Sequence, residues 1–528
     1  MRTRPRSVHA LTWRQLRVST LVIVALVAII LRIGLISYGL SGGVVGMIAL
    51  QPVIENPAVS ALYGRVTSLP TAGAFVEWRM GMFLALAVAL WAGMMATRVT
   101  RASEDEGTWD LLVTSARGRQ PALAATISSL LESGVLVGSV TIVMFTSGSP
   151  RLSSPVLYGV ATMGLAWTGT GAGLLASQFF APRRSATQVA LSAIAVAFIV
   201  RVIADGSTRL QWLRWLTPFG WVENVQAFHH SSPVWLLPLI VVPLALSAVA
   251  WQMQRQRDIG IAWWTRNDRS RGHEMLLRSP WRFAWRERWG MLLVWTTGLS
   301  VLGLVVGYLT NALVQLCRTD PGYVKLLRRW GLGSMVDGRG FIAQACLLLA
   351  VAISFMMAAL LVSIGTDSYQ GRLDLPLAYG TSRLKWLASA VLATAVATCV
   401  IAMVCALTMW LGVVASGTSM GILIPIEGMA NALTMAPWLI GASVLLIAVL
   451  PRYAFLVVAM MLTVFYIDAI LGPILHWPGL LLGASPFFHL HLVPVVASNW
   501  NATIILSAIG LVAGTLGASV FVRRDVGP

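Results

Sequence analysis

Twelve long apolar runs, separated by shorter polar segments, dominate the pattern of residues along the chain. A helix needs about 20 mostly apolar residues to cross a bilayer. The runs lie at residues 19–40, 80–97, 121–146, 155–178, 188–205, 234–252, 290–312, 342–364, 387–415, 436–450, 454–473 and 501–522. This pattern predicts an all-α polytopic membrane protein with twelve transmembrane helices. The run at 436–450 is the shortest, and an interfacial or re-entrant piece at 422–435 would lengthen it.

Composition and charge agree with this prediction. The chain is 57% hydrophobic and 11% charged, with a mean hydropathy of +0.77 and a net charge of +18. Lys and Arg are retained on the cytoplasmic side of short loops. If the N-terminus is cytoplasmic, most of the 38 Lys and Arg residues fall in cytoplasmic segments. We therefore expect both termini in the cytoplasm, and we interpret the positive charge as a signal of topology and of attraction to anionic lipids, with no nucleic-acid partner.

The chain repeats weakly along its length. Several short matches share an offset of about 267 residues, and their agreement indicates a duplication. They pair Trp13-Arg14 with Trp281-Arg282, Tyr63-Gly64 with Trp330-Gly331, Thr217-Pro218-Phe219 with Ser485-Pro486-Phe487, and Arg257-Asp258-Ile259-Gly260 with Arg524-Asp525-Val526-Gly527. The repeat predicts two pseudo-symmetric six-helix halves of the same orientation, at 1–252 and 289–528, joined by a cytoplasmic linker at 253–288. Segments 206–232 and 474–500 are predicted to form short amphipathic helices at the interface.

A polar stretch, RASEDEGTWDLLVTSARGR at 101–119, follows the second apolar run. Three acidic residues, Glu104, Asp105 and Glu106, lie near its front, and Arg117 and Arg119 lie at its back. This order suits the dipole of a helix, which is a purely structural explanation. The functional alternative is a docking surface, because a short helix fixed at both ends to membrane spans can transmit the movement of a soluble partner.

The same stretch occurs in both halves. The residues Glu106-Gly107-Thr108-Trp109-Asp110-Leu111 are matched by Gln370-Gly371-Arg372-Leu373-Asp374-Leu375 in the second half. Each copy lies in the predicted cytoplasmic loop between the second and third spans of its half. The sequence therefore predicts one polar cytoplasmic helix per half.

At these residues the chain resembles the permeases of ABC-2 type ABC exporters, in the fused twelve-span form typified by tetronasin-transport permeases. That family has an acidic-Gly-x-x-acidic-Leu-Leu segment after its second span, followed by an Arg-containing turn. The matching residues here are Glu106-Gly107-Thr108-Trp109-Asp110-Leu111-Leu112 and then Arg117, together with the segments Asn56–Gly64 and Thr217–Trp221. The resemblance covers essentially the whole chain. The second copy departs from it, because Gln370 replaces the acidic residue and Pro376 follows Leu375.

The resemblance implies an ABC-2 or type V exporter-like fold in which each half docks one ATP-hydrolysing subunit. Two copies of an ABC ATPase are therefore the expected partners, with ATP and Mg held on those subunits. The chain itself contains no Gly-x-x-x-x-Gly-Lys-Ser/Thr loop, so we expect a transport subunit that is not an enzyme and binds no cofactor. The expected docking residues of the two coupling helices are Glu104, Asp105, Glu106, Gly107, Asp110, Leu111, Leu112, Arg117, Gln370, Gly371, Asp374 and Leu375.

Ionisable residues inside membrane spans usually mark pathways or partners. Arg201 and Asp468 lie near the predicted outer ends of the fifth and eleventh spans and are related by the repeat. We expect them to pair across the symmetry axis and to close an outer gate. The alternative is that each is solvated at the lipid headgroups.

Other side chains in the spans are candidates for the transport cavity. Glu132 in the third span is either a neutral buried carboxyl or a contact for a cationic drug. Met94 and Met95 offer soft, adaptable surface, although such methionines also serve ordinary packing. The seven His and four Cys residues show no metal-ligand spacing, so no metal site is expected.

Together these features favour an export permease of the cell (inner) membrane that moves amphiphilic drugs or antibiotics with ATP hydrolysed on a partner. Lipid or cell-wall precursors are alternative cargo within the same family. An ion-coupled secondary transporter also commonly has two six-span halves, but it needs buried carboxylates, which are rare in these spans. A membrane-bound enzyme of lipid or glycan chemistry would need a cluster of acids, histidines or a nucleophile at one membrane face, and the sequence shows none.

Overall fold

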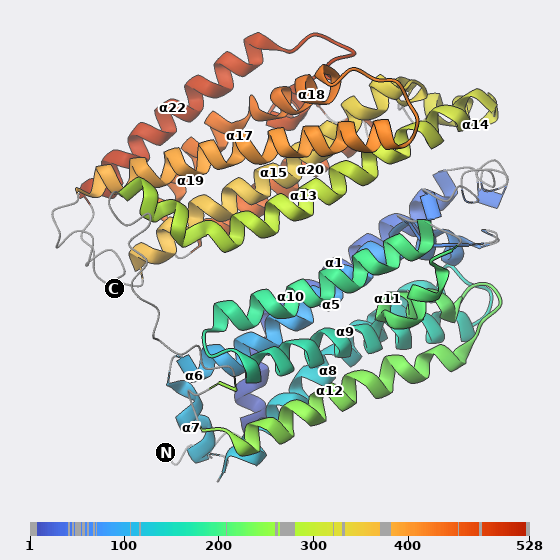
Figure 1. Ribbon diagram of the computed structural model, residues 1–528, viewed down its shortest axis with the longest axis vertical. Helices are drawn as coiled ribbons and strands as arrows, with labels where there is room; N and C mark the ends of the chain where they lie inside the picture. Colours follow the sequence, from blue (N-terminus) through green and yellow to red (C-terminus); the bar gives the residue numbers. More distant parts are fainter. Residues whose placement is uncertain are drawn as a thin grey trace. The chain divides into compact units, whose positions relative to one another are not determined.

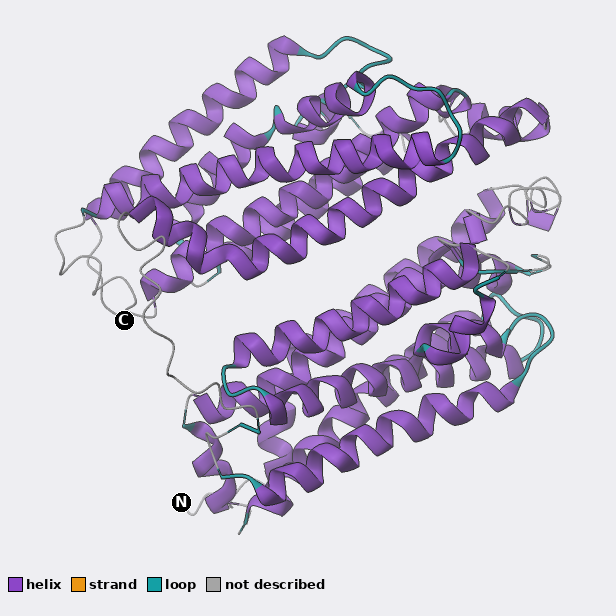
Figure 2. Ribbon diagram, viewed as in Figure 1, coloured by secondary structure: helices purple, strands orange, loops and turns teal. Residues whose placement is uncertain are grey.

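The computed structural model places most of the chain. The described residues are 8–40, 43–44, 47, 54, 59–60, 63–66, 69, 71–105, 107–115, 118–206, 209–258, 262–263, 280–319, 321–329, 333–369, 382–451, 453–474 and 478–523. In this part of the chain the regular secondary structure is entirely helical (Figure 2). The predicted all-α class is therefore confirmed.

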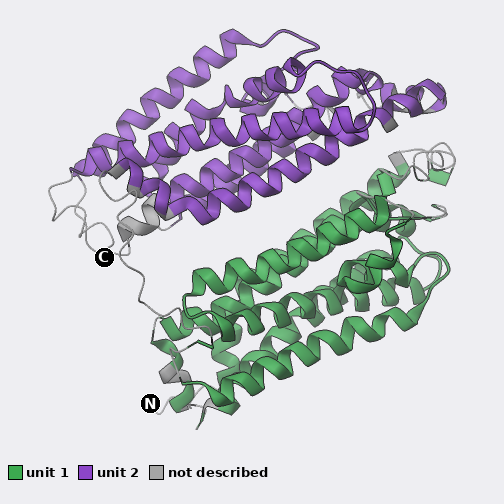
Figure 3. Cartoon of the chain, viewed as in Figure 1, with its two compact units in different colours: residues 1–269 green, residues 270–528 purple. Residues whose placement is uncertain are grey.

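The chain divides into two compact units, Met1–Arg269 and Ser270–Pro528 (Figure 3). Their boundary falls inside the segment that the sequence predicts as a linker, 253–288. Each unit has its own packed helices.

The first unit contains six long helices (Figure 1). They are α1 (Val8–Leu40), α5 (Ala72–Thr97), α8 (Arg119–Thr146), α9 (Ser153–Phe179), α10 (Arg183–Gly206) and α12 (Leu236–Gln256). Each of the six runs predicted as a span in this half falls on one of them. Shorter elements connect them: η1 (Arg98–Ala102), α6 (Ser103–Asp105), α7 (Thr108–Ser115), η2 (Gln211–Leu216), α11 (Pro218–Val225) and η3 (Pro233–Trp235).

The helix α9 is the centre of the first unit, because it packs against α5, α8, α10, α11 and α12. Small residues allow this close packing. A Cβ on Gly169 would lie 2.2 Å from the carbonyl oxygen of Ala89 in α5, and a Cβ on Gly164 would lie 2.7 Å from the carbonyl oxygen of Leu239 in α12. The backbones of the three helices therefore touch, which only glycine permits at these positions.

The second unit is built from another series of helices (Figure 1). They are α13 (Pro280–Thr319), α14 (Pro321–Arg329), η4 (Gly333–Val336), α15 (Gly338–Tyr369), α17 (Arg383–Ala415), α18 (Leu423–Leu433), α19 (Ala436–Val449), α20 (Ala454–Ile474), α21 (Gly479–Leu482), η5 (Pro486–His489) and α22 (Trp500–Arg523). The helix α13 packs along α17, and α19 packs along α22. A buried apolar cluster formed mainly by α15, α17, α19 and α20 makes up much of the core.

Among the described residues, ten helices are long and apolar enough to cross a membrane. The helix α9 is not one of the ten, and the apolar part of α20, Ala454–Ala469, is shorter than the others. The many Gly, Ser and Thr residues that let α9 pack closely also lower its hydropathy. The polytopic helical class is thus supported, and the count of twelve spans stays a prediction.

The predicted extension of the shortest span is present. Residues Leu423–Val449 form one apolar stretch, divided into α18 and α19 by a break at Thr434 and Met435. The repeated Pro-Phe turns also agree with the prediction of short helices, because α11 begins at Pro218 and η5 begins at Pro486. In the first of them Thr217 caps the helix by accepting a hydrogen bond from the N–H of Gly220 at 3.0 Å.

Candidate functional site

The polar stretch after α5 is a direct continuation of that helix. The α-helix passes at Arg98 into the π-helical turn η1 and then into α6, so that residues Ala72–Asp105 form one continuous helix. Single π-helical turns inside α-helices are rare and frequently mark functional sites. The chain then turns at Gly107, whose φ of +69° lies in the left-handed region, and begins α7.

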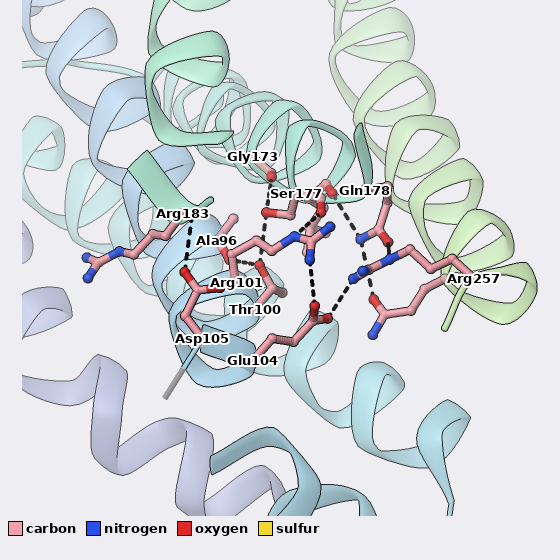
Figure 4. Close-up of polar contacts among 12 residues, drawn as sticks. Ala96, Thr100, Arg101, Glu104, Asp105, Gly173, Ser177, Gln178, Arg183 and Arg257 are labelled. Carbon is pink, nitrogen blue, oxygen red and sulfur yellow. Dashed lines mark hydrogen bonds and ion pairs between the residues drawn. The ribbon is translucent and has the colours of Figure 1, made fainter. Parts of the chain in front are cut away.

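Two arginines enclose the carboxylate of Glu104 at the end of this helix (Figure 4). Arg101 Nη1 lies 2.8 Å from Glu104 Oε2, and Arg257 Nη2 lies 2.6 Å from Glu104 Oε1. The exposed fractions of these side chains are 0% for Arg101, 2% for Glu104 and 4% for Arg257. Each carboxylate oxygen thus has its own guanidinium, which is a strong arrangement for a buried charge.

Neutral polar groups extend this network into α9 and α12. Arg257 Nε donates to Gln178 Oε1 at 2.8 Å, and the amide of Gln178 donates to Gln254 Oε1 at 3.3 Å. Arg101 Nε donates to the carbonyl oxygen of Ser177 at 2.5 Å. We name Arg101, Glu104, Gln178 and Arg257 the Glu104 network (Figure 4). It joins the end of α5 to the ends of α9 and α12.

The helix α7 is fixed by an apolar anchor. Trp109 is 1% exposed and belongs to a buried cluster with Val8 of α1 and with Ala122 and Leu123 of α8. A buried tryptophan contributes a large contact area, so α7 is held to the beginning of both membrane helices.

The structure differs from the sequence prediction at Glu104. Its side chain was expected on the docking surface, but it is buried between two arginines, so in this conformation it positions the segment and does not face a partner. Asp105 and Gly107 are exposed, as docking requires. Asp105 also accepts a hydrogen bond from the backbone N–H of Arg183 at 3.2 Å.

The remaining predicted docking positions are not tested. Glu106, Arg117, Gln370, Gly371, Asp374 and Leu375 lie outside the described residues, as do the side chains of Asp110, Leu111 and Leu112. Their role stays a prediction.

Sequence reasoning missed the partners of Glu104. Arg101 is three residues away and could have been paired with Glu104 from helical spacing. Arg257 is separated from Glu104 by 153 positions, and no local pattern connects them. Its only signal was its place in the repeated Arg-Asp-x-Gly sequence at the end of each half.

A second cluster of charges surrounds Arg201 of α10, which is completely buried. Arg201 Nε lies 2.6 Å from Asp205 Oδ2 and 3.3 Å from Glu223 Oε2 of α11. Asp205 also pairs with Arg214 at 2.5 Å. The segment before α5 joins this cluster, since the backbone N–H of Arg65 donates to Glu223 Oε1 at 2.5 Å. Burial and the nearby Arg214 lower the pKa of Arg65 from its usual value, while Asp205 and Glu223 oppose this shift.

The structure explains why glycine follows Tyr63 in the first half. The φ of Gly64 is +102°, and a Cβ there would lie 2.9 Å from Arg201 Nη2. Glycine is therefore required both for the backbone conformation and for the approach of the guanidinium.

The predicted pairing of Arg201 with Asp468 joins residues of different units and stays a prediction. The structure gives Arg201 partners within its own unit, Asp205 and Glu223. Asp468 of α20 is 5% exposed, and its carboxyl oxygens have no hydrogen-bond partner among the described residues.

The side chain of Glu132 of α8 is 48% exposed and has partners on α1, and its contact with a cationic drug stays a prediction. His9 Nε2 lies 2.9 Å from Glu132 Oε2, and Trp13 Nε1 donates to the same oxygen at 2.7 Å. A buried neutral carboxyl is thus excluded for this conformation. Met94 is 39% exposed, and Met95 packs against a buried apolar cluster that includes Leu16 of α1 and Ala96 of α5. Their place in a cavity stays a prediction.

Comparisons with known proteins support the expected family. The family described as "Multidrug efflux system permease Rv1217c, C-terminal domain" matches residues 277–522. The multidrug efflux system permease protein Rv1217c of Mycobacterium tuberculosis (strain ATCC 25618 / H37Rv) is 29% identical over 492 residues, which cover 90% of this chain and 86% of that protein. The chain is therefore similar to a multidrug efflux permease over most of its length, and its apolar helices agree with a multi-pass membrane protein.

Proposed function

We propose that the chain is the membrane-spanning subunit of an ATP-driven exporter of amphiphilic drugs or antibiotics. Two copies of a separate ABC ATPase supply the energy, and both termini lie in the cytoplasm. The observation that carries this proposal is the anchoring of the polar stretch 103–115, which is fixed to several membrane helices while Asp105 and Gly107 remain exposed. The similarity to a multidrug efflux permease supports the choice of cargo.

The contacts of this stretch suit the transmission of force. It is continuous with α5 and leads into α8. The pair of Glu104 with Arg257 ties it to the end of α12, and Trp109 ties it to α1. A partner that moves α6 and α7 therefore moves the ends of four membrane helices together, because packed elements transmit displacement instead of absorbing it.

Transport into inverted membrane vesicles tests the proposal. Vesicles that contain this chain and its ATPase are expected to take up an amphiphilic dye when ATP is supplied. Uptake should stop when ATP is replaced by a non-hydrolysable analogue. Uptake driven by a proton gradient without ATP would contradict the proposal and favour an ion-coupled secondary transporter. A panel of lipids, run in the same vesicles, separates drug cargo from lipid or cell-wall precursor cargo.

Charge reversal in the docking stretch is expected to detach the ATPase. The double variant Glu106→Lys/Asp110→Lys should lower the affinity of the ATPase at least about tenfold, equivalent to about 1.4 kcal/mol, because like charges at an interface repel. Quantitative co-purification of the complex measures this loss. Glu427→Lys is the matched control, since Glu427 of α18 is an exposed acidic residue that lies far along the sequence from both copies of the stretch. Equal recovery of the ATPase with the double variant would contradict the docking role.

A double-mutant cycle tests the predicted gate. If Arg201 and Asp468 pair in one state of the transport cycle, the effects of Arg201→Ala and Asp468→Ala on the transport rate should be non-additive, with a coupling of about 0.5–3 kcal/mol. The variants Arg201→Ala and Asp205→Ala should also be coupled, because these residues pair within the first unit at 2.6 Å. Coupling in the second cycle with additivity in the first would show that Arg201 acts only within its own unit.

A further inference from the structure

A pocket lies where the segment before α5 meets the beginning of α5 and the helix α11. Its lining includes Tyr63 and Arg65 of the segment, Glu77 and Trp78 of α5, and Glu223 of α11. All of these residues belong to the first unit. We name it the Glu77 pocket.

Glu77 has no ion pair among the described residues, although Arg65 and His229 also line the pocket. Its Oε2 is buried and has no hydrogen-bond partner in that part of the chain. The backbone N–H of Phe228 is its hydrogen-bond donor. The nearby Glu223 is compensated, because it pairs with Arg201 and accepts from the backbone of Arg65. A buried carboxylate without a partner is costly, so Glu77 requires either a proton or a cation.

Trp78 supplies a second, independent group that has no partner. It is 6% exposed, and its indole N–H has no acceptor among the described residues although the side chain lines the pocket. Its ring lies 5.2 Å, centroid to centroid, from the ring of Tyr63 at an angle of 37°. Burial also raises the pKa of Tyr63, which keeps this phenol neutral beside the carboxyl groups.

The chemistry of the lining selects one class of ligand. A carboxyl oxygen without a partner attracts positive charge, and the faces of tryptophan and tyrosine attract organic cations more than they attract neutral molecules. The indole N–H requires an acceptor. A ligand that carries an acceptor close to a cationic centre therefore satisfies both groups, which a bare proton or metal ion does not.

We propose that the Glu77 pocket binds the cationic head group of an amphiphilic organic ligand, with Glu77 as the counter-charge and the rings of Tyr63 and Trp78 as an aromatic wall. The inference rests on the proposed function and names the substrate class within it. Its test is an equilibrium binding measurement that needs neither the ATPase nor ATP.

Binding of benzoylcholine to the full chain in lipid nanodiscs, followed by isothermal titration calorimetry, provides this measurement. The neutral comparison is 3,3-dimethylbutyl benzoate, which has the same shape with carbon in place of the ammonium nitrogen. The chain is expected to bind the cation at least about tenfold more tightly, equivalent to about 1.4 kcal/mol. Equal binding of the two esters overturns the proposal, and this comparison requires no variant.

Variants of residues that line the Glu77 pocket test whether benzoylcholine binds there. Glu77→Gln is expected to weaken benzoylcholine at least about tenfold, whereas Glu77→Asp, which keeps the charge, should retain more of the affinity. Glu427→Gln is the matched control and should leave binding unchanged. Trp78→Leu provides a second route if Glu77→Gln does not yield monodisperse protein, and it too should weaken binding because the aromatic face is lost.

Three results overturn the inference. The first is unchanged affinity in both Glu77→Gln and Trp78→Leu, and the second is a loss of affinity in Glu427→Gln equal to that in Glu77→Gln. The third is one-to-one displacement of benzoylcholine by millimolar sodium, which would indicate an inorganic cation site. The proposed function fails separately. Absence of ATP-dependent export with intact benzoylcholine binding removes the exporter proposal alone, whereas export without this binding removes only the assignment of the pocket.

Discussion

Replacing Glu104 by Ala is expected to destabilise the first unit by about 3–5 kcal/mol, because it leaves two guanidinium groups buried without their shared carboxylate. Arg101 and Arg257 are 0% and 4% exposed, so water cannot solvate them in the folded state. The loss should appear as a lower midpoint of thermal unfolding of the purified chain, and ATP-driven transport by the complex should fall with it.

Asp105→Asn is the matched control for this experiment. Asp105 is the next residue in the same short helix, but it is exposed, and its contact is a single hydrogen bond from the N–H of Arg183. Removing its charge should change the stability by about 0.5 kcal/mol or less, as at most surface positions. If the two variants had equal midpoints, the Glu104 network would not stabilise the unit.

The substitution Gly169→Ala is expected to destabilise the first unit by about 1–3 kcal/mol, since it introduces a methyl group where two helix backbones touch. The new Cβ would lie 2.2 Å from the carbonyl oxygen of Ala89, and a backbone atom cannot rotate away as a side chain can. The helices α5 and α9 must separate, which also disturbs the packing of α9 against its other neighbours. Thermal unfolding of the purified variant measures the effect.

The substitution Gly298→Ala in α13 is not expected to destabilise the chain. No described atom lies within 4 Å of a Cβ at this position. Alanine favours the helix over glycine by about 1 kcal/mol, so this variant should be as stable as the original chain or more stable. A destabilisation of the same size at both positions would show that backbone contact is not the reason for Gly169.

The sequence predicted the long helices well because one physical requirement defines them. A lipid-facing helix must be apolar over about 20 residues, and that requirement leaves a pattern in the sequence. The helix α9 shows where the rule weakens. It packs against several other elements, and the small residues that allow this packing lower its hydropathy. The sequence therefore predicted a span here, but the helix is not among those apolar enough to be identified as membrane-spanning.

The polar stretch that forms the candidate site was predicted less completely than the long helices. The polar stretch after α5 was recognised in the sequence, and its docking role stays a prediction with which the exposure of Asp105 agrees. The burial of Glu104 could not be predicted, because it depends on Arg257 at the other end of the first half. Charge spacing in a sequence reveals partners within one helical turn, as for Arg201 and Asp205, but contains no information about contacts between distant helices.

The position of Arg257 has a consequence for communication along the chain. Helix α12 ends at Gln256, and Arg257 is the next residue, so the peptide that continues toward the second half starts at the residue held by Glu104. Any shift of α6 pulls on the origin of that connection. The first residue of the segment that leads toward the second unit is therefore fixed by the same carboxylate that fixes the end of α6.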